Sequence, residues 1–253
     1  MRKVLGSVVL LGGLTITTGA LAQEANVGMA LPGSAPAPAT ATTATTDHDQ
    51  VVGRLAVGYL GRSTVGFGAG IDDYAETVEA PVVGIRYWLS PVIGLDAGLG
   101  FFSSGGSGET DDGMTTTSAD LPSHLGFLVH AGLPIALASA DHFTFEIIPE
   151  LNVGIGSGSE TDEATEVETT MNGFHLDVGA RAGAEIHFGF MKLPQLSLQG
   201  SIGLLFALDS AKTTQELNGD SVETTGSRTI FTTTVGSNPW NIFTSNVAAL
   251  YYF

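Results

Sequence analysis

Cysteine is absent from the 253-residue chain, and lysine occurs only at Lys3, Lys192 and Lys212. Without cysteine, disulfide bonds are excluded, so backbone hydrogen bonds and packing must stabilise the fold. Charged residues are also scarce, at 14%, yet the formal net charge is −17. This acidic balance argues against binding to nucleic acid or to an anionic lipid surface, because both attract Lys and Arg.

A long apolar run is also missing after residue 22. The best candidate, residues 125–140, is interrupted by His130 and Pro134 and is too short for a spanning helix. A helical inner-membrane protein is therefore not expected. The classes that remain are a β-protein in an outer membrane and a soluble periplasmic β-protein.

The N-terminal 50 residues read as targeting and linking segments. Arg2 and Lys3 precede an apolar stretch, and Ala20-Leu21-Ala22 fits a small-x-small cleavage site, so residues 1–22 are predicted to be a signal peptide. Residues 23–50 are rich in Ala, Pro and Thr and have too little apolar bulk to pack. We expect them to form a flexible periplasmic lead-in.

From residue 51 onward, apolar segments of strand length alternate with polar, Gly- and Thr-rich segments. In residues 93–101, Ile, Leu, Ala, Leu and Phe share one face, and Gly94, Asp96, Gly98 and Gly100 share the other. Residues 173–190 repeat this alternation with a charged second face. The pattern predicts strands. We place them near 51–61, 81–90, 92–102, 123–137, 142–155, 173–190, 195–208 and 241–253.

The predicted connections alternate in length. Ser90-Pro91, residues 139–141 and residues 191–194 are short, whereas 62–80, 103–122, 156–172 and 209–240 are long and acidic. Such alternation is typical of an antiparallel up-and-down transmembrane β-barrel with short turns in the periplasm. Residues 51–253 are thus predicted to form an all-β barrel of eight strands. If residues 64–71 and 229–235 are further strands, the number becomes ten.

The chain ends on a hydrophobic strand with a terminal aromatic residue. Val247, Ala249, Tyr251 and Phe253 share one face. This end, with the signal peptide and the alternating strands, resembles the small bacterial outer-membrane β-barrels, the group that holds the OmpA-like transmembrane domain and the OmpX- and OmpW-like proteins. The resemblance covers roughly residues 51–253. It implies that Val247, Tyr251 and Phe253 form a signal for the barrel assembly machinery and that the protein resides in the cell outer membrane of a Gram-negative bacterium.

The strand register directs a set of ionisable side chains to the inner face. The expected charge network inside the barrel consists of Arg54, Arg86, Asp96, Glu146, Glu150, Asp177, Arg181 and Glu185, with His124, His130, His175 and His187 on the same face. Small barrels fill their interiors with side chains, and buried charges must be paired. We therefore expect a closed interior in preference to an ion path or a catalytic site.

Known catalytic signatures are absent from the sequence. Ser123 and His124 are adjacent on a strand and point to opposite faces, and no G-x-S-x-G, H-E-x-x-H or phosphate-binding loop occurs. No enzyme activity, cofactor or metal site is predicted. The acidic loops could meet lipopolysaccharide through divalent cations, or meet an external partner. We expect a monomer with a structural or surface-interaction role, and the alternative is a narrow channel or carrier for small or hydrophobic molecules.

Overall fold

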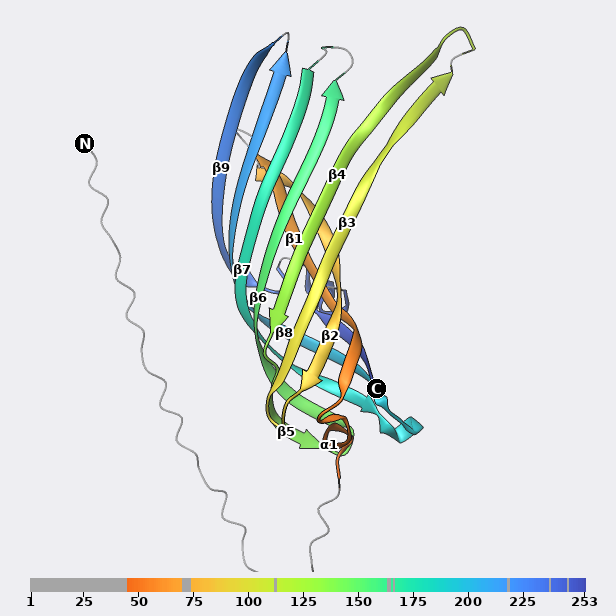
Figure 1. The fold of residues 1–253 in the computed structure, drawn as a ribbon, viewed down its shortest axis with the longest axis vertical. Helices are drawn as coiled ribbons and strands as arrows, with labels where there is room; N and C mark the ends of the chain where they lie inside the picture. The colour runs from red at the N-terminus through yellow and green to blue at the C-terminus, as the bar shows by residue number, and fades with distance from the viewer. Residues whose placement is uncertain are drawn as a thin grey trace, which may run out of the picture. The chain divides into compact units, whose positions relative to one another are not determined.

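The computed structural model describes residues 45–69, 74–111, 113–162, 165, 167–217, 219–236, 238–244 and 246–253. The predicted signal peptide and most of the predicted lead-in lie outside these residues. The described part is an antiparallel β-sheet with a short helix, α1 (Asp47–Val51), before it (Figure 1). The strands are β1 (Leu55–Ala69), β2 (Tyr74–Trp88), β3 (Gly94–Asp111), β4 (Thr116–Gly132), β5 (Ile135–Ala140), β6 (Phe143–Asp162), β7 (Val167–Phe188), β8 (Leu193–Leu217), β9 (Asp220–Thr233) and β10 (Val247–Tyr252). Two 3-10 helices, Gly189–Met191 and Pro239–Phe243, lie between strands.

The hydrogen bonds of the sheet close into a ring through eight strands. The ring runs β1, β2, β3, β4, β6, β7, β8 and β10, and β10 pairs with β1. β4 and β5 pair with successive parts of β6, and β9 and β10 pair with successive parts of β8. The sheet therefore has ten strands, although only eight form the ring. Residues 64–69 belong to β1 and residues 229–233 belong to β9, so neither adds a position to the ring.

Burial alternates along the strands as the sequence predicts. On β3, Leu95, Leu99 and Phe101 are exposed, and Asp96 is buried between them. On β7, Val178 and Ile186 are exposed, whereas Asp177 and Glu185 are buried. The polar side of the ring faces inward, because a strand presents successive side chains to opposite faces of its sheet.

The strands are longer than the sequence pattern indicates. The segments 62–80, 103–122, 156–172 and 209–240 are mostly paired strand and not loop. β3 and β4 pair as far as Asp111 opposite Thr116, and β8 and β9 pair as far as Leu217 opposite Asp220. Thr and Ser carry these hairpins with few buried apolar side chains, which is why alternation of apolar residues does not reveal them. The hairpins extend away from α1 at what we call the hairpin end of the ring (Figure 1).

The far parts of β1 and β2, residues 61–69 and 74–81, form what we call the inner hairpin. β1 pairs with β10 only from Ala56 to Tyr59, and a bulge follows at Leu60, next to Gly61, whose φ of 111° suits glycine. β2 pairs with β3 only from Val82 onward, directly after Pro81, which has no N–H to offer. Beyond these points the two strands pair only with each other.

The inner hairpin lies against the inner face of β6 and β7. A Cβ added to Gly173 on β7 would fall 2.0 Å from the carbonyl oxygen of Gly66 on β1, so the two backbones are in direct contact. Val65 and Phe67 are fully buried there, next to Gly154 and Gly156 of β6. Glycine at these positions lets one strand pack directly on another, and the inner hairpin fills the ring at this level.

Candidate functional site: a polar network inside the ring

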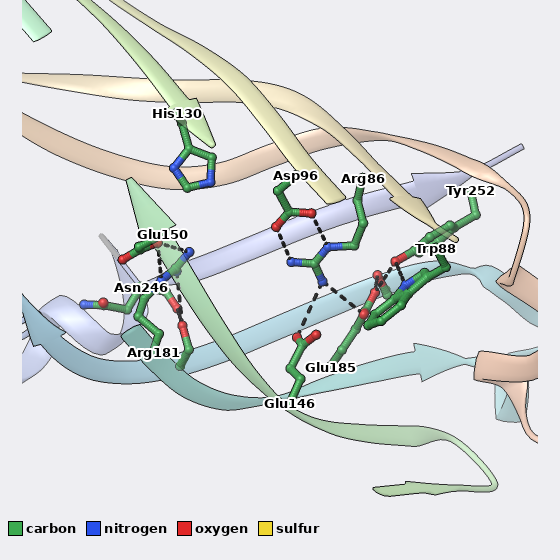
Figure 2. A network of polar contacts seen from close by, with 12 residues as sticks. Arg86, Trp88, Asp96, His130, Glu146, Glu150, Arg181, Glu185, Asn246 and Tyr252 are labelled. Carbon is green, nitrogen blue, oxygen red and sulfur yellow. Dashed lines mark hydrogen bonds and ion pairs between the residues drawn. The ribbon is translucent and has the colours of Figure 1, made fainter. Parts of the chain in front are cut away.

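The first cluster surrounds Arg86 of β2. Its guanidinium group donates two hydrogen bonds of 2.7 Å to the carboxylate of Asp96, which lies directly opposite on β3. Nη1 of the same group lies 3.1 Å from Glu185 Oε2 and 3.5 Å from Glu146 Oε1 (Figure 2). All four side chains are at most 1% exposed. One buried guanidinium therefore faces three buried carboxyl groups.

The C-terminal strand joins this cluster through its inward face. Trp88 Nε1 donates to the hydroxyl oxygen of Tyr252 over 3.1 Å, and that hydroxyl donates to Glu185 Oε1 over 2.8 Å (Figure 2). Ser197 also donates to Glu185, over 2.5 Å. Glu185 is thus held by β2, β8 and β10 at once, which ties the closure between β8, β10 and β1 to the buried charges.

A second ion pair lies nearer the hairpin end. Arg181 of β7 donates to Glu150 Oε2 of β6 from Nε (2.8 Å) and Nη2 (2.7 Å). Its Nη1 donates to Ser201 of β8, whose hydroxyl donates to the backbone carbonyl oxygen of Asn246 (Figure 2). Nε and Nη2 thus both converge on one carboxylate oxygen, and such charge-assisted hydrogen bonds are strong. The pair therefore joins β6, β7 and β8 to the segment that precedes β10.

A row of polar side chains crosses the ring beside this pair. Asn152 and Asp177 lie directly opposite each other on β6 and β7, and His130 lies opposite Asn152 on β4. Asn152 Nδ2 donates to Asp177 Oδ1 (2.7 Å), which leaves Asn152 Oδ1 to accept from His130 Nδ1, also at 2.7 Å. The carboxylate thus orients the amide, and the amide orients the imidazole.

The row continues from Asp177 toward β9. Nε2 of His175 lies 2.9 Å from Asp177 Oδ2, and its Nδ1 lies 2.6 Å from Asp209 Oδ1. Because carboxylates only accept, both ring nitrogens donate and the ring carries a positive charge. Asp209 in turn accepts from Arg228 over 3.2 Å. Ser63 of the inner hairpin donates to Asp177 as well, and not to a histidine as a nucleophilic serine would.

α1 covers the other end of the ring, which we call the α1 end. Asp47 Oδ2 accepts from the backbone N–H of Gly189 (3.0 Å) and lies 2.7 Å from His142 Nδ1. His48 is 1% exposed, with its ring edge-on to Trp88 and its Nε2 3.0 Å from the carbonyl oxygen of Pro91. Burial lowers the pKa of His48 below its usual value of 6.5. The helix begins with a capping box between Thr46 and Asp49, so residues 46–51 are ordered here, although the composition places most of them in a flexible lead-in.

The structure brings together seven of the eight residues expected to form the charge network. Arg86, Asp96, Glu146 and Glu185 form one cluster, Glu150 and Arg181 form a pair, and Asp177 joins the histidine row. Arg54 precedes β1 and is exposed, so it does not reach them. The strand begins at Leu55 and not at residue 51, which places Arg54 in the link from α1.

The C-terminal residues lie as the alternation indicates. Tyr251 and Phe253 are exposed by 45% and 69%, and Val247 is half-buried on the same face. Tyr252 points inward, and with Trp88 and Asn152 it belongs to the network, although none of the three is among the residues expected there. Asn152 shares the sequence parity of Glu146 and Glu150, and this signal was sufficient to find it. Asp209 lies in β8, in the segment 209–240 that the sequence pattern predicts to be a loop.

A cavity of about 180 Å³ opens beside the second pair and the row. It is lined on one side by Glu150, Arg181 and His175 and on the other by Arg62 and Glu79 of the inner hairpin. Arg62 and Glu79 form an ion pair, with side chains 35% and 55% exposed, and mark where the cavity meets solvent. This volume is the space open to the centre of a water-sized sphere, of which one water needs about 10–15 Å³. The cavity can therefore hold a molecule of several heavy atoms.

Comparisons with protein-family models, with curated proteins and with solved structures give no match to this chain. Within the described part of the chain, no helix has the length and apolarity needed to cross a membrane. Among the same residues, no group of three or more His, Asp and Glu side chains is arranged to hold a metal ion.

Proposed function

We propose that the ring is an outer-membrane β-barrel with a closed interior, and that the protein acts through the hairpins that extend from it. The observation that carries this proposal is the outward face of the ring. Large apolar side chains are exposed on it strand after strand, for example Val83 and Ile85 on β2, Leu95 and Leu99 on β3, and Ile202 on β8. Soluble proteins rarely expose apolar patches beyond a few hundred Å².

The height of this apolar face suits a bilayer. On β6, exposed apolar side chains extend from Phe143 through Phe145, Ile147 and Leu151 to Ile155. At about 3.3 Å per residue this segment is roughly 40 Å long, and a strand tilt of about 40° reduces its height to about 30 Å, close to the hydrocarbon thickness of a bilayer. Beyond Ile155, the strand continues through Ser157, Ser159 and Glu160, which a lipid environment would not accommodate.

The polar hairpins then carry the interaction with the outside. Carboxylates lie along them at Glu109, Asp111, Glu160, Asp162 and Glu223. Lipopolysaccharide is the partner that fits them best, through divalent cations that bridge these carboxylates to lipid phosphates. The ring itself would serve as an anchor whose interior needs no passage, because buried ion pairs and the inner hairpin fill it.

The test of this proposal is the orientation of the chain in intact cells. A cysteine introduced at Thr116 or Thr165, both at the hairpin end, should react in whole cells with a reagent that cannot cross the membrane. Ala140→Cys, at the α1 end, should react only after the outer membrane is opened. Labelling of Ala140→Cys alone in whole cells would mean that the orientation is the reverse. If no labelled protein is found in the membrane fraction, the membrane assignment is refuted.

A narrow channel or carrier for small molecules is the second candidate, and the cavity beside Arg62 and Glu79 favours it. A planar-bilayer conductance record separates the two. A closed anchor should show little or no current. A large and steady current would require an open path that by-passes the Arg86 cluster and the inner hairpin, and would replace the first candidate with the second.

A further inference from the structure

The charge balance inside the ring is unequal. Six carboxylate side chains that line the interior are at most 10% exposed: Asp96, Glu146, Glu150, Asp177, Glu185 and Asp209. The cations of comparable burial among the described residues of the ring are Arg86, Arg181 and His175. Arg228, which is 37% exposed, pairs with Asp209, so the shortage of cations lies in the Arg86 cluster, where three carboxyl groups share one guanidinium.

The charged side chains that line the cavity balance one another, with Glu79, Glu150 and Asp177 against Arg62, Arg181 and His175, but two hydrogen-bond acceptors of the lining are unused. Glu150 gives only Oε2 to Arg181, so its Oε1 accepts no hydrogen bond from the described residues. Asn246 uses its amide nitrogen on the carbonyl oxygens of Thr234 and Asn241, and its Oδ1 likewise accepts none from them. Both residues line the cavity. Hydrogen-bond donors on a ligand would therefore find two acceptors in the lining.

The Arg86 cluster lies close to one of the residues that line the cavity. His130 lines the cavity, and its Nε2 and Asp96 Oδ2 lie 3.4 Å and 3.5 Å from the point where a Cβ on Gly132 would stand. Through His130 the lining of the cavity therefore comes near the cluster in which three carboxyl groups share one guanidinium.

We propose that the cavity binds a small organic cation that carries a primary ammonium group, with Glu150 Oε1 and Asn246 Oδ1 as its acceptors and the Arg62–Glu79 pair at its entrance. The ammonium group supplies several N–H donors for the two unused acceptors and a positive charge for the unused oxygen of the Glu150 carboxylate. The site concerns the interior alone, and it stands whether the ring lies in a membrane or not.

Four solutes of similar size test the proposal on the full chain refolded in nonionic detergent. Ethylammonium has charge and N–H donors, tetramethylammonium has charge alone, ethylene glycol has donors alone, and acetate is an anion. Two-dimensional NMR follows the side-chain amides of Asn246, Asn241 and Asn152 during each titration. Ethylammonium should shift these signals saturably, and the other three should bind at least tenfold more weakly.

A pair of matched variants locates the site. Glu150→Gln keeps the shape of the side chain and removes its charge, and should weaken ethylammonium at least tenfold. Glu216→Gln makes the same change at an exposed position of β8 outside the cavity, and should leave binding unaltered. If Glu150→Gln does not fold, the ranking of the four solutes on the wild-type chain decides alone.

Three results would overturn the proposal. The first is no saturable shift with ethylammonium in a folded sample. The second is an equal response to another solute. An equal response to tetramethylammonium would indicate a nonspecific charge effect, and an equal response to ethylene glycol would indicate a general polar cavity. The third is an equal loss of binding in Glu150→Gln and Glu216→Gln, which would place the effect in the net charge of the chain and not in the cavity.

Discussion

The two halves of the ring interior are filled by different chemistry. Toward the α1 end, Arg86 and its three carboxyl partners occupy the space with charge, and every group depends on a named partner. Toward the hairpin end, Val65 and Phe67 of the inner hairpin pack on glycines of β6 and β7. The first half therefore depends on the presence of charged side chains, and the second depends on glycines whose lack of a side chain makes room for the inner hairpin.

This difference decides how each half responds to mutation. A buried charge that loses its partner keeps its full desolvation penalty, whereas a truncated apolar side chain leaves a void into which its neighbours can partly relax. The polar half should therefore be the more sensitive to a single truncation, and the apolar half the more sensitive to a single added methyl group.

The largest expected effect is that of Arg86→Ala. Removal of the guanidinium leaves three carboxyl groups buried without a cation, and losing one partner of a buried pair typically costs about 3–5 kcal/mol. Denaturant unfolding of the refolded protein should show this loss, and Arg181→Ala should follow the same direction. Arg62→Ala is the control, because its exposed pair with Glu79 contributes at most about 1 kcal/mol. Equal stability of Arg86→Ala and the parent would mean that water solvates the cluster.

The apolar half is tested by Phe67→Ala. Truncation of a buried phenylalanine costs roughly 3 kcal/mol when the surroundings can settle, as the inner hairpin can because it is held at neither edge by a neighbouring strand. Phe231→Ala, on an exposed ring of β9, should change the unfolding free energy far less. Should the two variants prove equally stable, the inner hairpin does not hold its place in solution, and the comparison between the halves fails.

A smaller effect is expected from pH at the α1 end. Since burial lowers the pKa of His48 in the folded protein, its contribution to stability is present above pH 6.5 and is lost as the pH falls below 6.5 toward the folded pKa. The slope cannot exceed about 1.4 kcal/mol per pH unit for one proton. The protection factors of the α1 amides against hydrogen exchange, which correct for the slower intrinsic exchange at low pH, should fall on acidification, and His48→Gln should remove that dependence. An unchanged dependence in the variant would assign it to another group.

The smallest effect on the finished fold is expected from deletion of Phe253. Its ring is 69% exposed, and its main stabilising contact is the backbone hydrogen bond to the carbonyl oxygen of Leu55 (2.9 Å). We expect the deletion to refold in detergent with stability within about 1 kcal/mol of the parent, but to reach a lower assembled level in cells. Tyr252→Phe, which loses the buried bonds to Trp88 and Glu185, should show the reverse. An equal loss in both settings would make Phe253 a packing residue.

The sequence is most informative where apolar and charged residues alternate. This pattern identifies the strands around Asp96, Asp177 and Glu185 and places their carboxylates inward, because period two is a property of every strand. It does not say which cation meets which carboxylate, since the register between strands is set by the whole sheet. Arg86 and Asp96 are brought opposite each other by pairing that neither strand encodes alone.

The inner hairpin is the part that the sequence does not reveal. Its Gly, Ser and Thr residues resemble those of a solvated loop. The residues of β6 and β7 that it contacts are glycines, whose lack of a side chain gives no sign of the contact in the sequence. Gly61 and Pro81 could have signalled the departure of β1 and β2 from the ring, but each is as common in an ordinary turn. The direction in which the hairpin leaves depends on β6 and β7, about a hundred residues further along the chain.

The contacts of α1 determine when this helix can dock during folding. Asp47 and His48 make their bonds to three separate places, at Pro91, at Asp141 with His142, and at Gly189. These turns come from different strand pairs and meet only when β2, β6 and β7 stand in their final order. The segment that is synthesised before every strand can therefore complete its hydrogen bonds only after the strands are in place. Full docking of α1 thus requires a correctly closed ring.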